Sequence, residues 1–319
     1  MQKFRGSVLL ITHKRVAELR EVIESLESAW TAEYKTINVI LHKDGANVRK
    51  EIERIPVTRR NIIEVERFNS LNARSAINSN VHDGLRASFQ DNEIDYVTVI
   101  EDDIRVRKDF LKFNAEIIRK NIKNRDFMGI NGFSAAEFNG DKDDVYGKFR
   151  YGFGWGWTIS RLTWDKLSDF WTGNENVHWD AYIETFLKTG YVVMPHNCRI
   201  QNLGFGETAT HTREIPKIAV PMEKSLLDIN NPSINTKLRE EIFSLNWRKD
   251  CLIFLSSKNL FSKSITMLFI SQYFLSKISR KISRTRRFLA KFNGSLVRLA
   301  RLLTYISLRA PVKKEMNPL

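Results

Sequence analysis

The first hundred residues alternate between short apolar runs and segments with helical periodicity. In Val16–Leu26 and Ile77–Phe89, apolar residues recur every three or four positions, which predicts helices. Strands that alternate with helices form mostly parallel sheets covered on both faces, so we expect a Rossmann-like α/β domain. Four apolar runs of strand length are Val8–Ile11, Ile37–Leu41, Ile62–Val65 and Tyr96–Ile100.

The last of these runs leads directly into three acids, Glu101, Asp102 and Asp103. Adjacent carboxylates repel one another and are costly to desolvate, so a partner is expected. They and Asp44 follow predicted strands, where parallel sheets bind ligands. The pattern favours Mg²⁺ or Mn²⁺, held by one or two carboxylates and by substrate phosphates. The alternatives are helix capping and a solvated turn, although Asp109 stands where it can cap the next predicted helix.

Glycine motifs that cradle phosphate groups are absent from the sequence. No GxGxxG follows the first predicted strand, and no GxxxxGK[ST] occurs. A phosphorylated ligand held by metal and carboxylates instead indicates a sugar-nucleotide enzyme. The segment "YGFGWGW" at residues 151–157, which includes Trp155, is rich in aromatic residues and glycine. We expect it to form a wall against which a sugar packs.

The net charge of +14 belongs to one end of the chain. Between Cys251 and Lys314 there are 14 Lys or Arg and no acid, which leaves 37 basic and 37 acidic residues elsewhere. This shift predicts a main domain over residues 1–225 and a basic helical region over 226–319. The two cysteines, Cys198 and Cys251, lack metal-binding spacing and fit a reducing compartment.

The basic region has the pattern of amphipathic helices, with apolar residues on one face and Lys and Arg on the other. Its longest uncharged run, Ser264–Ser276, has 13 residues and is too short to span a bilayer. Such helices lie in the membrane interface and bind anionic lipid. We therefore expect a cytoplasmic protein, peripheral on the inner face of the plasma membrane. The alternative is a helical hairpin packed on the main domain; nucleic acid is not expected, because no binding motif is present.

Four stretches, in order along residues 7–215, carry a family resemblance. They are "VIEDDIRVRKDFLKF", "GFGWGWTISRLTWDKL", "HWDAYI" and "NLGFGETATHT". Together they resemble the GT-A glycosyltransferases, and more narrowly the β-1,2-N-acetylglucosaminyltransferase I family and its O-mannose relative. The resemblance implies a GT-A fold, a divalent cation and inverting transfer of a sugar from a UDP-sugar donor.

The resemblance also implies roles for the acids. Asp103 would be the direct metal ligand, with Glu101 and Asp102 at the ribose and the sugar of the donor. Asp44 would lie by the uracil ring. Asp180, in "HWDAYI", would be the catalytic base that takes the proton of the acceptor hydroxyl.

Basic residues complete the implied donor site. Lys14 and Arg15, at the start of the first predicted helix, occupy the place of a family arginine near the nucleotide, and the resemblance does not distinguish between them. His211 would lie near the pyrophosphate. Asn80 departs from the family, which has a histidine near the base at this place.

The sequence thus predicts a metal-dependent inverting glycosyltransferase that uses Mn²⁺ or Mg²⁺. Its donor is expected to be a UDP-sugar, with GlcNAc as the first choice of sugar. Its acceptor is expected to be a glycan or lipid-linked sugar in surface polysaccharide or lipopolysaccharide synthesis. The alternatives are transfer of another sugar, such as galactose, and a non-catalytic basic adaptor for membranes or nucleic acid that retains the fold.

Overall fold

The computed structural model describes residues 3–43, 45–66, 73–134, 142–149, 155–169, 171, 190–204 and 238–241, with the backbone alone at 73 and 74. The chain divides into two compact units, residues 1–244 and 245–319, and every described residue belongs to the first. The basic helices predicted for the C-terminal region lie outside the described residues. Of the helices that are described, none combines the length and apolar character needed to cross a bilayer.

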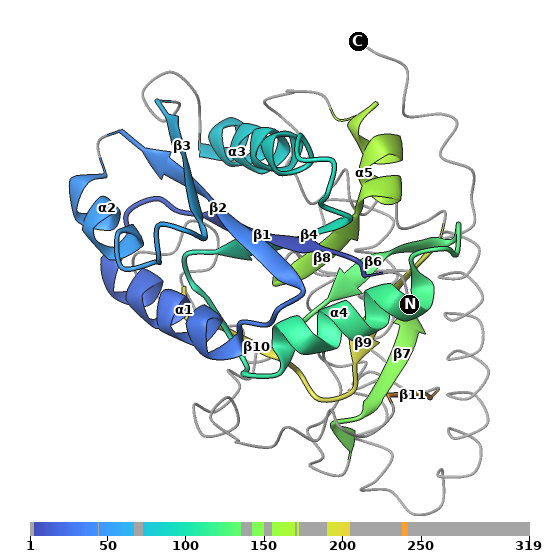
Figure 1. Cartoon of the computed structure of the whole chain (residues 1–319). Coiled ribbons are helices and arrows are strands. Elements are labelled where there is room, and N and C mark those ends of the chain that lie inside the picture. Colours follow the sequence, from blue (N-terminus) through green and yellow to red (C-terminus); the bar gives the residue numbers. More distant parts are fainter. Residues whose placement is uncertain are drawn as a thin grey trace, which may run out of the picture. The chain divides into compact units, whose positions relative to one another are not determined.

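A mixed nine-stranded sheet forms the centre of the described part, in the order β11-β7-β9-β6-β8-β4-β1-β2-β3 (Figure 1). β1 pairs in parallel with β2 and β4, and β2 pairs in parallel with β3. A separate antiparallel pair joins β5 (Ile104–Val106) to β10 (Ile200–Asn202). The strands of the large sheet are β1 (Gly6–Ile11), β2 (Tyr34–His42), β3 (Arg60–Val65), β4 (Tyr96–Glu101), β6 (Phe127–Asn131), β7 (Val145–Phe149), β8 (Trp157–Ser160), β9 (Tyr191–Pro195) and β11 (Arg239–Glu240).

Helices cover both faces of this sheet. Figure 1 shows α3 and α5 on one face and α1, α2 and α4 on the other. The predicted Rossmann-like fold class, a mostly parallel sheet with flanking helices, is confirmed. The helices are α1 (Val16–Ala29), α2 (Ala46–Ile52), α3 (Ala73–Ser88), α4 (Phe110–Asn121) and α5 (Arg161–Ser168).

The apolar pattern explains the core. All six residues of β1 are buried, as expected for a central strand covered on both sides. The inward face of α4, which includes Phe110, Phe113 and Ile117 at helical spacing, is buried as well. Ser160 caps α5, because its hydroxyl accepts a hydrogen bond from the backbone N–H of Thr163 at 3.2 Å. The antiparallel strands β7 and β8 were not predicted.

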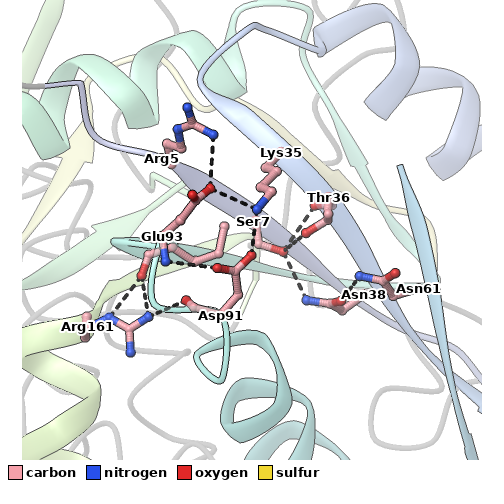
Figure 2. Close-up of polar contacts among 10 residues, drawn as sticks. Arg5, Ser7, Lys35, Thr36, Asn38, Asn61, Asp91, Glu93 and Arg161 are labelled. Atoms are coloured by element: carbon pink, nitrogen blue, oxygen red, sulfur yellow. Dashed lines mark hydrogen bonds and ion pairs between the residues drawn. The ribbon is translucent and has the colours of Figure 1, made fainter. Parts of the chain in front are cut away.

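Polar contacts tie together the amino-terminal ends of β1, β2 and β4 (Figure 2). Lys35 Nζ lies 2.9 Å from Asp91 Oδ2 and 3.0 Å from Glu93 Oε2, and Arg5 Nη1 lies 3.2 Å from the same Glu93 oxygen. Arg161 donates hydrogen bonds to three backbone carbonyl oxygens just before β4. Acids and bases are therefore paired with one another at this end of the sheet.

Candidate functional site

The acid triplet lies at the opposite end of the same strands. β4 ends at Glu101 and β5 begins at Ile104, so Asp102 and Asp103 form the turn between them. Glu101 stands beside Ile11, the last residue of β1. Asp102 is 7% exposed and Asp103 is 6% exposed, so the solvated-turn alternative is wrong. The triplet lies beyond the carboxyl ends of parallel strands, as predicted.

The capping alternative is also wrong for this triplet. α4 begins at Phe110, well after the acids, and none of them lies at its N-cap position. Asp109 occupies that position but makes no side-chain cap hydrogen bond, which corrects the expectation that it caps the helix. Its carboxylate is used elsewhere, because Asp109 Oδ1 pairs with Arg107 Nε at 2.9 Å.

Two groups from the end of β1 and the start of α1 stabilise the buried carboxylates. The backbone N–H of His13 donates to Asp102 Oδ2 at 2.8 Å. Arg15 Nη1 forms an ion pair and hydrogen bond with Asp103 Oδ2 and lies 3.6 Å from Asp102 Oδ1. The side chain of Lys14 is exposed, so Arg15 is the member of the predicted Lys14/Arg15 pair that contacts the acids.

Negative charge in the turn remains incompletely neutralised. Burial, followed by the charge of Asp103, raises the pKa of Asp102 to about 7. Burial also raises the pKa of Asp103, against the opposing effect of Arg15. A further positive charge at this turn would therefore be favourable.

Asp103 has a side-chain oxygen suited to a cation. Its Oδ1 atom is buried and has no hydrogen-bond partner among the described residues, whereas Oδ2 is paired with Arg15. Within the same residues, no group of three or more His, Cys, Asp or Glu is arranged to hold a metal ion. Mg²⁺ and Mn²⁺ sites completed by substrate phosphates need only one or two carboxylates, so the residues present fit such a cation.

The segment that follows β10 lies directly against this turn. Asn202 pairs with Ile104 in the β5–β10 ladder, and the N–H of Leu203 donates to the carbonyl oxygen of Asp103 at 2.7 Å. A Cβ built on Gly204 would collide with Asp103 Oδ2 and lie 2.7 Å from Arg15 Nη1. The backbone at Gly204 therefore closes over the ion pair, and a larger residue there would displace the side chains of Asp103 and Arg15. The "NLG" start of the fourth resemblance stretch thus meets the acids of the first.

The glycine–tryptophan stretch also reaches this region. Gly156 has φ +58°, and its carbonyl oxygen accepts the N–H of Gly132 at 2.7 Å. A Cβ on Gly156 would lie 2.7 Å from Ile200 Cγ2 and 3.6 Å from Ile104 Cγ2, so this stretch packs on β10 and β5. Trp155 is half-buried and packs edge-on against Phe133, with ring centroids 5.0 Å apart. Contact of Trp155 with a sugar stays a prediction.

Two histidines beside the acids were missed by the sequence reasoning. His13 follows β1 and His42 ends β2, and their ring centroids lie 5.2 Å apart. Asn80 Nδ2 lies 3.2 Å from His42 Nε2. Asn80, the position at which the resemblance expects a histidine, therefore faces these two histidines. The signal was present in the sequence, because a His-Lys dipeptide stands near the carboxyl end of each strand, at residues 13–14 and 42–43.

Three predicted site residues lie outside the described residues, namely Asp44, Asp180 and His211. Lys43 and Gly45 are described on either side of Asp44, and the N–H of Gly45 donates to the carbonyl oxygen of His42 at 2.9 Å. The roles of Asp44, Asp180 and His211 stay predictions.

A second buried charge cluster lies at the other end of β5. Arg107 makes two hydrogen bonds to Asp143, at 2.8 and 2.7 Å. Arg199 Nε lies 3.2 Å from Asp109 Oδ2, and the Arg199 guanidinium stacks 4.1 Å from the ring centroid of Phe113. The two arginines are 1% and 0% exposed. This cluster fastens the starts of α4 and β10 to the end of β5.

The fold and the turn between β4 and β5 define a Rossmann-like α/β domain with an acidic site at the carboxyl ends of β1 and β4. Sequence comparison finds similarity to alpha-1,3-mannosyl-glycoprotein 2-beta-N-acetylglucosaminyltransferase of Arabidopsis thaliana. The two are 27% identical over 125 residues, which is 36% of this chain and 26% of that protein. The chain thus spans about a quarter of the length of the curated relative that it matches. This match confirms the family resemblance.

The chain was also compared with protein-family models and with solved structures. No family model matches the chain. Among solved structures, the crystal structure of S. aureus TarS 1-349 is similar, with a TM-score of 0.44 and 12% sequence identity. That similarity covers 62% of this chain and 60% of the TarS chain.

Proposed function

We propose that the protein is a metal-dependent inverting glycosyltransferase that moves a sugar, GlcNAc as the first candidate, from a UDP-sugar to a glycan or lipid-linked acceptor. The observation that supports this most is Asp103 Oδ1, a buried carboxylate oxygen without a hydrogen-bond partner among the described residues. It lies in a strand-end turn that the backbone of Leu203 and Gly204 covers. The similarity to a named N-acetylglucosaminyltransferase points the same way.

Asp103, together with the donor diphosphate, would hold Mn²⁺ or Mg²⁺. When bound, the cation supplies positive charge that stabilises the departing UDP. Glu101 and Asp102 would accept hydrogen bonds from hydroxyl groups of the donor, and Asp44 would bind the base. Trp155 and His211 would contact the sugar and the pyrophosphate.

Asp180 would act as the general base in the transfer itself. It would take the proton of the acceptor hydroxyl as that oxygen forms a bond to the anomeric carbon. The bond from the anomeric carbon to the phosphate oxygen breaks at the same time, and UDP leaves with the electron pair. Attack from the side opposite UDP inverts the configuration.

A donor screen tests this function directly. The full chain, Mn²⁺ and a panel of UDP-sugars should release UDP with one preferred sugar. Asp180→Asn should lower kcat by about 10²–10⁴-fold while the affinity for the donor stays close to wild type, because an amide keeps the shape of the carboxylate but cannot take the proton. Wild-type turnover in this variant would place the base elsewhere, and no release with any donor would favour the non-catalytic adaptor.

We also propose that the basic region, residues 226–319, holds the protein on the inner face of the plasma membrane in the cytoplasm. The supporting observation is that the segment between Cys251 and Lys314 contains 14 Lys or Arg residues and no Asp or Glu. Full-length protein should sediment with anionic phosphatidylglycerol vesicles and be released as salt rises, because electrostatic attraction is screened. Equal binding to neutral phosphatidylcholine vesicles would contradict the electrostatic part of the proposal.

A further inference from the structure

The guanidinium of Arg15 lies beside both buried carboxylates of the acidic turn. It pairs with Asp103 Oδ2 and lies 3.6 Å from Asp102 Oδ1, so one positive charge serves two buried carboxylates. The other oxygen of Asp103, Oδ1, has no hydrogen-bond partner in the described part of the chain. The carboxylate that fits a divalent cation is therefore already bound to a cationic side chain.

The position of Arg15 in the chain allows this contact to be exchanged. Arg15 is the N-cap residue of α1, and its side chain makes no cap hydrogen bond. Its side chain is 17% exposed, which leaves a route towards solvent. Gly204 lies against the ion pair and has no side chain that could hold the guanidinium of Arg15 in place. The guanidinium can leave Asp103 without breaking a helical backbone hydrogen bond.

We propose that Arg15 is a tethered counter-ion that competes with the divalent cation for Asp103 and moves to the donor diphosphate when both ligands bind. This rests on the proposed function, because it requires a cation and a nucleoside diphosphate at the acidic turn. Two positive charges beside one carboxylate repel each other, so the ion pair weakens cation binding in the absence of nucleotide. The diphosphate offers Arg15 an alternative bidentate partner, and this makes cation and nucleotide binding mutually favourable.

The proposal distinguishes Arg15 from an ordinary structural ion pair. A structural partner would stabilise the turn, and its removal would leave the coupling between cation and nucleotide unchanged. A competing counter-ion has the opposite signature. Its removal strengthens binding of the cation alone, and it lowers the factor by which nucleotide tightens that binding.

The test measures Mn²⁺ binding to the full chain by calorimetry, without and with saturating UDP, so that it does not depend on catalysis. Arg15→Met should bind Mn²⁺ alone about tenfold more tightly than wild type, within the usual range of coupling factors. The tightening by UDP should fall by about the same factor. Lys14→Met is the matched control, because it removes the same charge from an exposed neighbouring position, and Mn²⁺ affinity without nucleotide should stay within about twofold.

Arg15→Lys covers the case in which Arg15→Met does not fold. Lysine keeps the charge but loses the two-pronged donor geometry, so Mn²⁺ affinity should lie between those of wild type and Arg15→Met. Unchanged or weaker Mn²⁺ binding in the Arg15 variants, with clear binding in wild type, would overturn the exchange and leave the proposed function standing. If no protein binds Mn²⁺ with or without UDP, both the exchange and the metal dependence of the proposed function are wrong.

Discussion

Two buried charge clusters lie at the two ends of β5, and they differ in balance. At the start of the strand, Asp102 and Asp103 share one guanidinium, that of Arg15. After its end, Asp109 and Asp143 are matched by two buried arginines, Arg107 and Arg199. The carboxylates of both clusters are buried, so burial alone does not explain the contrast between them.

The two clusters shift the pKa of a buried carboxyl group in opposite directions. Burial opposes ionisation of Asp143, but hydrogen bonds from Arg107 and Asn197 outweigh it and lower its pKa. In the acidic turn, burial and like charge together raise the pKa of Asp102 to about 7. Contacts that lower the pKa of Asp143 favour its charged form in the folded state, whereas an environment that raises the pKa of Asp102 favours a further positive ligand.

The largest effect on stability should come from unbalancing the matched cluster. Arg199→Met leaves Asp109 buried beside one fewer cation and should lower the free energy of unfolding by about 3–5 kcal/mol. Urea denaturation measures this loss. Arg199→Met combined with Asp109→Asn removes both charges, and it should recover part of the stability. A loss below about 1 kcal/mol in the single variant would show that the cluster is not structural.

The acidic turn should respond in the opposite way to loss of a charge. Asp103→Asn should weaken Mn²⁺ binding in the presence of UDP by at least about 100-fold, because it removes the charge of the proposed ligand. The melting temperature in EDTA should be unchanged or higher, since repulsion from Asp102 is relieved. Unchanged Mn²⁺ affinity would remove Asp103 from the metal site, and unfolding of the variant would make this cluster structural like its neighbour.

The sequence predicted the acidic turn and missed the balanced cluster for the same physical reason. Three adjacent acids after a buried strand are local, so their repulsion can be inferred from a few letters of sequence. Arg107, Asp143 and Arg199 are brought together only by the tertiary fold, with separations of 36 residues between the first two and 90 between Arg199 and Asp109. A buried arginine and an exposed one look alike in a sequence.

The same limit applies to the elements themselves. Apolar runs that are buried on both faces, such as β1 and β4, were predicted closely. β5 and β10 have three residues each and depend on pairing with one another, so neither has a pattern of its own. The contact of Arg15 with Asp103, across 88 residues, follows from the parallel pairing of β1 with β4 and could not be predicted before it.

A pH titration tests the raised pKa of Asp102. In EDTA at pH 8, Asp102→Asn should stabilise the protein by up to about 4 kcal/mol, because a neutral amide removes the cost of the buried charge and still accepts the hydrogen bond from His13. The folded-state pKa of about 7 lies above the ordinary value of about 4, so wild-type stability falls as pH rises from about 4 to about 7. The advantage of the variant should therefore vanish near pH 4 and level off above pH 7. A difference that is constant across this range would contradict the raised pKa.

The smallest effect should come from the amino-terminal end of the sheet, where acids and bases are matched but exposed (Figure 2). Lys35 pairs with both Asp91 and Glu93, yet its side chain is 38% exposed and that of Glu93 is 60% exposed. Water and salt screen such pairs, so Lys35→Met should change the melting temperature by less than about 1 °C. Differential scanning calorimetry at low and high salt measures this change. A loss of stability as large as that of Arg199→Met would mean that ion pairing alone determines how much a charged residue contributes to the free energy of unfolding. A negligible loss would mean that this contribution depends on burial, which the carboxylates of the two β5 clusters share and this exposed surface lacks.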